Sequence, residues 1–376
     1  MKIVIAPDKF KGSLSAEEVA AVLANGLEEM PDAETVRRPM ADGGEGTTEA
    51  LIASLGGVWK PCKVTGPLPE TEIEAGFGWM EAQRIAVIEM AAAAGLVLVP
   101  ESERNPLQTT TRGVGQLLLA AAQEGARQIL LGVGGSATVD GGVGAAQALG
   151  WQFLDRNGQP LAPGGGALRA LRTLLPAASA TVLPKVRVLC DVDNPLLGPE
   201  GAARVFGPQK GASEEMVAQL EAGLERLARC CREQLGIEIG DLPGGGAAGG
   251  LAAGARAFFG AELTSGIDAV MEICGLEAAM QGAAWVVTGE GCFDEQSLRG
   301  KVVAGVTRLA RQCGARVAVV AGRVRVAESV WSGAGIDLVV EAAPAGTSTE
   351  EAMAQAGPLL REAAERLAVK LREARR

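Results

Sequence analysis

Carboxylates, lysines and hydroxyl groups gather with glycine in three short stretches of the sequence, residues 8–13, 42–47 and 288–301. Their polar members are Asp8, Lys9, Lys11 and Ser13; Asp42, Glu45 and Thr47; and Glu290, Asp294, Gln296, Ser297 and Lys301. Glycine-rich backbone that leads into a helix offers unpaired N–H groups to an anion, and carboxylates bind hard divalent cations. These stretches therefore indicate phosphate and metal chemistry.

Two further polar stretches follow apolar runs. Residues 132–142 come after the run 129–131, and residues 190–195 come after the run 186–189. Both sets of residues are expected at strand ends, where open α/β sheets bind ligands. The candidate site therefore also includes Gly134, Gly135, Ser136, Thr138, Asp140, Asp191 and Asn194.

Lysine is rare in this chain, and its distribution is uneven. Arginine serves at most basic positions, but Lys9, Lys11, Lys210 and Lys301 lie in or beside glycine-rich stretches. A compact ammonium group suits contact with phosphate better than it suits a general surface role. We therefore add Lys210 to the candidate residues.

Composition excludes several kinds of chemistry. The 376 residues contain no histidine, which excludes His-ligated metals and Ser-His-Asp or Cys-His catalysis. The net charge of −10 argues against a nucleic-acid surface. The seven cysteines form no Cys-x-x-Cys pair, which favours a reduced compartment, and no apolar run has the length of a membrane span. We expect a cytoplasmic protein whose carboxylates or lysines move protons.

The elements that must position these residues alternate between strand and helix at both ends of the chain. Apolar runs and helical periodicity predict strands at 3–6, 35–39, 285–287, 317–321 and 338–340, and helices at 15–29, 47–55, 302–313 and from about 350. Five strands that alternate with helices are typical of a doubly wound parallel sheet. If their order is 2-1-3-4-5, the loops after the first and third strands meet at one edge of the sheet, with the loop after the second alongside.

The middle of the chain has a different rhythm. Alternating apolar residues between 58 and 90 predict antiparallel strands. We therefore predict an α/β protein in which residues 1–57 and 282–376 form one flavodoxin-like domain, interrupted by a mixed α/β domain at 58–281. The substrates are expected in the cleft between the two domains.

Phosphoryl transfer fits these residues, because it needs a divalent ion held by carboxylates, cations near the phosphoryl group and a base near the acceptor hydroxyl. The sequence has no Gly-x-x-x-x-Gly-Lys-Ser/Thr motif, so it is not a Walker-type nucleotide hydrolase. Oxygen ligands indicate Mg2+ as the metal.

Six motifs, taken together, resemble the bacterial glycerate kinase family, type 1. They lie at residues 6–15, 42–47, 132–142, 191–196, 205–212 and 288–301, in order along the whole chain. The resemblance implies ATP-dependent phosphorylation of D-glycerate, usually at the 2-hydroxyl to give 2-phosphoglycerate. It also implies a flavodoxin-like domain that carries an inserted domain with a restriction-enzyme-like fold.

Within that reading, each candidate residue has an expected role. We expect Asp42 and Glu45, with Asp191 as a second candidate, to bind the metal or act as general base, and Asp42 and Asp191 are the candidate metal ligands. Lys11 and Lys301 are expected to face the phosphates.

The anionic oxygens have candidate partners in the middle of the chain. Backbone N–H groups of Gly134, Gly135 and Ser136 are expected to cradle them, and Arg112 is expected to hold the glycerate carboxylate through two hydrogen bonds. The partners are small molecules, and the protein is a monomer or a homodimer.

Two of the departures from the family pattern add or remove a positive charge. Cys292 stands where the family usually has Arg, and Lys9 stands where Ser is common. We hypothesise that Lys9 supplies the missing positive charge. Independent drift at two tolerant positions is the alternative.

Other functions remain open at the level of sequence. They are a glycerate 3-kinase, a kinase for another small hydroxy acid and, outside enzymes, a two-domain sensor of small anions. A coupled ADP-release assay with D-glycerate separates a glycerate kinase from the last two possibilities, and phosphorus NMR of the product distinguishes 2-phosphoglycerate from 3-phosphoglycerate.

Overall fold

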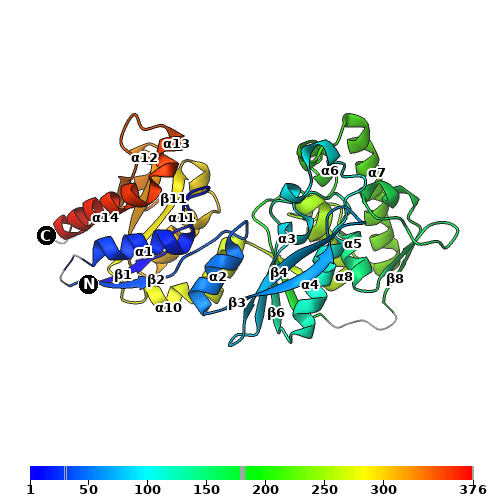
Figure 1. Ribbon diagram of the computed structural model, residues 1–376, viewed down its shortest axis with the longest axis horizontal. Coiled ribbons are helices and arrows are strands. Elements are labelled where there is room, and N and C mark those ends of the chain that lie inside the picture. The colour runs from blue at the N-terminus through cyan, green and yellow to red at the C-terminus, as the bar shows by residue number, and fades with distance from the viewer. Residues whose placement is uncertain (29, 31, 178–182, 375–376) are drawn as a thin grey trace. The chain divides into compact units, whose positions relative to one another are not determined.

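The computed structural model describes residues 1–28, 30, 32–177 and 183–374 (Figure 1). It is a mixed α/β structure whose chain divides into two compact units. Unit 1 contains residues 1–42, 49–56 and 267–376, and unit 2 contains residues 43–48 and 57–266. Among the described residues, no helix combines the length and apolar character that crossing a membrane requires.

Unit 1 is built on a parallel sheet of five strands in the order β13-β12-β11-β1-β2. Counted along the chain this order is 2-1-3-4-5, as expected. Its strands are β1 (Lys2–Ile5), β2 (Glu34–Arg37), β11 (Trp285–Phe293), β12 (Arg316–Val324) and β13 (Leu338–Glu341). Its helices are α1 (Ala16–Leu27), α2 (Thr47–Leu55), α9 (Gly266–Ile273), α10 (Leu276–Met280), η7 (Gln296–Leu298), α11 (Val302–Gln312), α12 (Glu328–Gly333), α13 (Thr349–Ala354) and α14 (Ala356–Glu373). At their ends, α2 and α9 include residues of unit 2.

Helices α1 and α14 lie side by side on one face of this sheet (Figure 1). Helix α1 begins with a capping box, in which the Glu18 N–H donates to Ser15 Oγ (3.3 Å) and the Ser15 N–H donates to Glu18 Oε2 (2.8 Å). A Cβ atom at Gly26 would lie 2.5 Å from the Ala364 Cβ, so glycine permits the close approach of α14. Glu29, the last residue of the helix predicted here, lies outside the described residues.

Two elements of unit 1 differ from the expectation. Strand β11 continues through Glu290 and Cys292 to Phe293, because β12 pairs with it over the same length. The predicted loop at 288–297 is therefore partly strand. The predicted final helix is two helices, α13 and α14, which are separated at Gln355, where φ is −109° and ψ is 20°.

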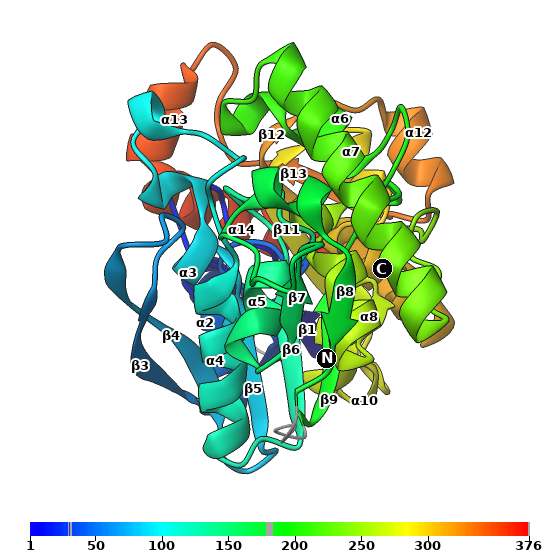
Figure 2. The same cartoon turned by 90° about the vertical axis from the view of Figure 1, so that its right-hand side faces the viewer.

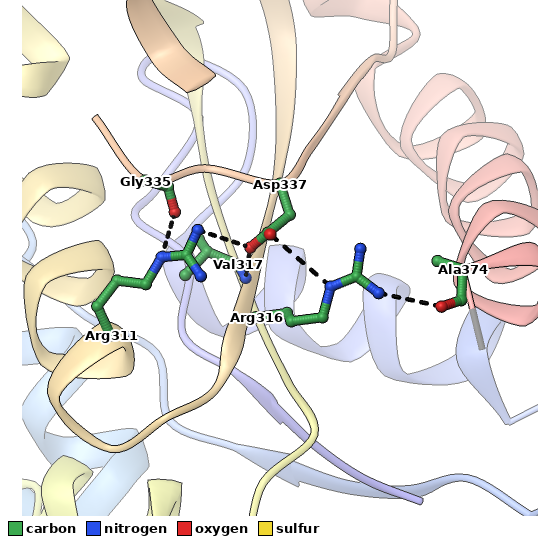
Figure 3. Close-up of polar contacts among 6 residues, drawn as sticks. All are labelled: Arg311, Arg316, Val317, Gly335, Asp337 and Ala374. Atoms are coloured by element: carbon green, nitrogen blue, oxygen red, sulfur yellow. Dashed lines mark hydrogen bonds and ion pairs between the residues drawn. The ribbon is translucent and has the colours of Figure 1, made fainter. Parts of the chain in front are cut away.

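An ion-pair network lies at the amino ends of β12 and β13 (Figure 3). The Asp337 carboxylate accepts from the Val317 N–H (2.8 Å) and pairs with Arg311 (3.2 Å) and Arg316 (3.7 Å). Arg316 also donates to the Ala374 carbonyl (3.1 Å) and therefore ties the C-terminal helix to the sheet.

Unit 2 contains a six-stranded mixed sheet in the order β10-β9-β6-β5-β4-β3 and a two-stranded sheet, β7-β8. Its strands are β3 (Val58–Thr65), β4 (Glu72–Met80), β5 (Ile85–Glu89), β6 (Gln128–Gly132), β7 (Gln152–Leu154), β8 (Thr173–Leu175), β9 (Lys185–Leu189) and β10 (Glu262–Thr264). Its helices are α3 (Ala91–Ala94), η1 (Leu96–Leu98), η2 (Glu101–Glu103), α4 (Arg112–Gln123), α5 (Val143–Ala148), η3 (Gly165–Ala170), α6 (Ala202–Phe206), η4 (Pro208–Lys210), α7 (Glu214–Cys230), η5 (Cys231–Leu235), η6 (Ala247–Gly250) and α8 (Leu251–Phe259).

The strands at 58–89 pair antiparallel, as expected, and β5, β6, β9 and β10 are parallel. Figure 2 shows β5, β6 and β9 running beside one another. The polar stretches after β6 and β9 therefore begin at the same edge of this sheet.

Candidate functional site

In unit 1, the carboxyl ends of three neighbouring strands bring together the first group of predicted residues. Past β1, the Ala6 and Asp8 N–H groups donate to the carbonyls of Val287 (2.7 Å) and Gly289 (2.8 Å) on β11. The Met40 N–H, after β2, donates to the Pro7 carbonyl (2.9 Å). Asp8, Asp42 and Glu290 therefore gather at one edge of the sheet.

The carboxyl groups at this edge repel one another. Burial, followed by the charge of Asp42, raises the pKa of Asp8 to about 7, although the Lys9 N–H donates to its Oδ1 (2.7 Å). Burial also raises the pKa of Glu290 to about 7, with Asp294 and Asp42 adding to the effect and Ser297 and Lys301 opposing it. Two carboxyl groups therefore change charge near neutral pH, where general bases work best.

Asp294 organises the turn that follows β11. Its Oδ1 accepts from the backbone N–H groups of Gln296 (2.8 Å) and Ser297 (3.2 Å), and its own N–H donates to Ser297 Oγ (3.0 Å). Ser297 is buried, whereas the Gln296 side chain is exposed. This turn leads into α11, and Lys301 is the residue before that helix.

The first stretch forms a tight turn before α1. The Ser13 hydroxyl donates to the Phe10 carbonyl (3.0 Å), and Gly12 takes a φ of +77°, which favours glycine. Lys11 is exposed, and Lys9 is close enough to Asp8 to lower its pKa by charge.

Cys292 has arginines on and after the neighbouring strand β12. It pairs in register with Arg323 on β12, and the nearby charge of Arg325 lowers the Cys292 pKa, although burial raises it overall. The guanidinium of Arg323 donates to the carbonyls of Pro344 (3.1 Å) and Thr347. Arg323 and Arg325 therefore place positive charge near Cys292, and whether Lys9 adds to it stays a prediction.

In unit 2, the stretch Gly43–Thr48 is held by a carboxylate that the sequence analysis missed. Glu89, the last residue of β5, accepts from the Thr48 N–H through Oε1 (2.8 Å) and from the Gly46 N–H through Oε2 (3.3 Å). It thereby satisfies N–H groups at the start of α2, while Glu45 stays exposed. The sequence signal that could have identified Glu89 is its position directly after the apolar run 85–88.

Asp140 fixes the loop after β6 from inside. It is 1% exposed and accepts from the Thr111 N–H (2.8 Å), the Thr111 hydroxyl (2.9 Å) and the N–H groups of Gly142 (3.1 Å) and Gly144 (3.2 Å). Burial raises the pKa of Asp140, and these four hydrogen bonds oppose the shift. Thr111 was not assigned a role from the sequence.

Lys210 reaches the same loop from η4. Its Nζ donates to Ser136 Oγ (2.7 Å) and to the Thr138 carbonyl (2.8 Å), and the residue is 2% exposed. Burial lowers the Lys210 pKa to about 7 against the opposing charge of Asp140. The buried Thr138 hydroxyl has no hydrogen-bond partner among the described residues.

The outer part of this loop is open. Gly134 and Gly135 are exposed and Ser136 is partly exposed. Backbone hydrogen bonds from Leu96 to the Gly135 carbonyl (2.8 Å) and from Ala137 to the Ala94 carbonyl (2.9 Å) hold the loop in place. Among the described residues, the N–H groups of residues 134–136 donate no backbone hydrogen bond, so they are backbone donors suited to an anion.

The remaining predicted residues lie near strand and helix ends. Asp191, which is exposed, accepts from the Gly266 N–H through Oδ1 (2.9 Å). Asn194 donates to the Glu200 carbonyl (2.8 Å), and Arg112 is the exposed first residue of α4.

The carboxylates do not form a complete metal cage by themselves. Over the described part of the chain, no set of three or more Cys, Asp or Glu residues is placed to enclose an ion. However, Glu290 Oε1 is buried and has no hydrogen-bond partner among the described residues. The negative charge of Asp42 acts on both Asp8 and Glu290 and raises the pKa of each. This donor set fits an Mg2+ that keeps phosphate oxygens and water among its ligands.

Comparison with known proteins gives one consistent result. The model of the glycerate kinase family matches residues 3–372. The chain is 47% identical to the glycerate 2-kinase of Escherichia coli over 342 residues, 90% of each chain. It is 44% identical to the glycerate kinase of Halalkalibacterium halodurans over 373 residues, covering 98% of this chain and 97% of that one.

A solved structure agrees with these relatives. The crystal structure of a protein from Salmonella typhimurium LT2, provisionally named glycerate kinase 2, superposes with a TM-score of 0.91 at 42% identity, covering 100% of this chain and 99% of that one. This chain belongs to the glycerate kinase family.

Proposed function

We propose that this protein transfers the terminal phosphoryl group of ATP to the 2-hydroxyl of D-glycerate, which gives 2-phosphoglycerate and ADP. The observation that carries the proposal is the convergence of Asp8, Asp42 and Glu290 at one sheet edge, with the pKa values of Asp8 and Glu290 raised to about 7. Family membership and the names of the relatives support the same reaction.

Asp8 is our choice for the general base. It follows β1, which lies between β11, the strand that contains Glu290, and β2, the strand that precedes Asp42. A carboxylate with a pKa near the working pH can take the proton of the glycerate 2-hydroxyl as that oxygen attacks phosphorus. Asp42, Glu45 and Asp191 remain further candidates for base or metal ligand.

Asp42 and Glu290 would hold Mg2+, because the unpartnered Glu290 oxygen needs a cation or a donor. When bound, Mg2+ offsets negative charge on the phosphate oxygens. Lys11 and Lys301 lie on stretches adjoining the same edge and supply further positive charge.

Unit 2 supplies donors to anionic oxygen. The N–H groups of Gly134, Gly135 and Ser136 are proposed to bind an anionic oxygen of a substrate, and Arg112 to hold the glycerate carboxylate. The buried groups Asp140 and Lys210 support this loop from inside the unit.

The fold and bounds of the two domains and the cellular location are proposed as well. We propose that residues 1–57 and 282–376, which include most of unit 1, form a flavodoxin-like domain, and that residues 58–281 form an inserted restriction-enzyme-like domain. The strand order of unit 1 supports the first part. We further propose a cytoplasmic location, in keeping with seven unpaired cysteines.

The test is a coupled assay of ADP release with D-glycerate, ATP and Mg2+. Asp42→Asn should lower kcat by about 100-fold or more if Asp42 holds the metal or acts as base. Asp241→Asn, at an exposed position in unit 2, is the matched control. Turnover with another hydroxy acid but not with D-glycerate would contradict the proposed substrate, and binding without turnover would favour an anion sensor.

A further inference from the structure

Lys210 is a buried lysine that makes two hydrogen bonds to the loop after β6. Pro208 and Gly211 fix the turn that presents it. Gly211 has a φ of +92°, and a Cβ atom there would lie 2.4 Å from the Arg104 carbonyl oxygen, so only glycine fits. The ammonium is therefore held beneath the loop by the backbone on both sides of the lysine.

The bond between Lys210 and Ser136 has a fixed direction while the lysine is charged. An ammonium group only donates, so Ser136 Oγ must be the acceptor. Within the described part of the chain this is the one hydrogen bond given to the Ser136 side chain. The hydroxyl hydrogen of Ser136 is therefore left to donate elsewhere, and the side chain is partly exposed beside the open N–H groups of Gly134 and Gly135.

We infer that Lys210 is a positioning residue that makes the Ser136 hydroxyl a hydrogen-bond donor to an anionic oxygen of the substrate at residues 134–136. The inference rests on the proposed function, because it assumes that this loop binds a substrate phosphate or carboxylate. Lys210 acts through Ser136 and touches no substrate itself. A hydroxyl that already accepts from a cation is a stronger donor, because hydrogen bonds in a chain polarise one another.

The charge of Lys210 controls the direction of this bond. Asp140, from the loop above it, is the charged group that acts on the ammonium and favours its protonated form, whereas burial lowers its pKa to about 7. A neutral amine can accept the Ser136 hydrogen, which removes the donor from the substrate. Anion affinity should therefore fall as the pH rises through about 7.

The experiment combines two substitutions and their double variant. Lys210→Met keeps most of the length of the unbranched side chain and removes the donor, and Ser136→Ala removes the hydroxyl. Each should raise the KM for ATP or for D-glycerate by about 10- to 100-fold with a much smaller effect on kcat, the range expected for losing one charge-assisted hydrogen bond. The double variant should match Ser136→Ala, because Lys210 acts only through the Ser136 hydroxyl and has nothing to position once that hydroxyl is gone.

The pH dependence of KM, with a control variant, separates a positioning role from a role in stability. Between about pH 6.5 and 8.5 the wild-type KM for that substrate should rise, whereas the rise should be much smaller in both single variants, in which Asp8 and Glu290 still change charge but the Lys210–Ser136 bond is absent. Lys60→Met is the control, since Lys60 pairs with Glu124 on the outside of unit 2. If Lys210→Met fails to fold, the magnitude and pH profile of Ser136→Ala decide the matter.

Calorimetric titration of ATP and of D-glycerate, each alone, makes the test independent of turnover. An inactive wild type would contradict the proposed function, while the calorimetric affinities would still decide the role of Lys210. Unchanged affinities for both ligands in Ser136→Ala and Lys210→Met would overturn the inference. Independent, multiplicative losses in the double variant would also overturn it.

Discussion

Replacing Asp8 by Asn should make unit 1 more stable at neutral pH while it removes activity. The Asn side chain keeps an oxygen that accepts from the Lys9 N–H, a bond of 2.7 Å in the native structure. It removes the charge that burial and Asp42 oppose. A buried carboxylate that is kept for catalysis is expected to lower the stability of the folded protein.

The magnitude follows from the pKa. In the folded protein the pKa of Asp8 is raised from its ordinary 3.8 to about 7, so the folded state keeps a proton that the unfolded state releases. Stability therefore falls as the pH rises from about 4 to about 7, by up to about 4 kcal/mol. Because the neighbouring carboxylates share the repulsion, we expect Asp8→Asn to gain about 2–4 kcal/mol at about pH 8 and about half of that at about pH 5.5.

Hydrogen exchange resolved by peptide is the assay, because the two units need not unfold together. Peptides that cover β1 and β11 report on unit 1, and peptides that cover β6 and β9 serve as an internal reference. The kcat should fall by about 100-fold or more, the contribution of a general base. Equal protection at both pH values, or a loss of protection at pH 8, would refute the reasoning.

Three other predictions concern separate contacts. Glu89→Gln should lower kcat by about 10-fold with a small change in Tm, because the side-chain NH2 group of glutamine would face the backbone N–H of Gly46 or Thr48. Steady-state kinetics, with Glu89→Asp as the comparison variant, measure this effect, and an unchanged kcat would contradict it. Asp337→Asn should destabilise unit 1 by about 1–3 kcal/mol, because Arg311 and Arg316 lose the carboxylate with which both pair (Figure 3). Denaturant titration measures this loss of stability, and kcat should stay within about twofold of the wild-type value. Lys9→Ser should raise the KM for ATP or D-glycerate if Lys9 replaces the charge missing at Cys292; two unchanged KM values would leave independent drift as the explanation.

Local patterns in the sequence were enough to locate most elements of unit 1. Continuous apolar runs predict buried parallel strands, and β1, β12 and β13 overlap the predicted segments. The extension of β11 through Glu290 was not predicted, because polar and glycine residues in a strand give no local signal. It depends on pairing with β12, which only the tertiary structure supplies.

In the candidate site, too, some residues could be located from the sequence, whereas others depend on tertiary contacts. Asp8, Asp42 and Glu290 were predictable, because acids after parallel strands collect at one edge. Glu89 was missed because its partners, Gly46 and Thr48, are distant in the sequence. The burial of Lys210 was also hidden, since a lysine beside glycine suggests contact with phosphate, whereas its bonds to Ser136 and Thr138 depend on how the unit packs.

Phosphorus NMR of the product tests the central claim most directly. D-Glycerate, ATP and Mg2+ are incubated with the protein, and the new phosphate ester is identified by its coupling to the glycerate protons. We predict 2-phosphoglycerate, with ADP formed in equal amount. Formation of 3-phosphoglycerate would contradict the proposed acceptor hydroxyl, and ADP without any phosphoglycerate would contradict phosphoryl transfer to glycerate.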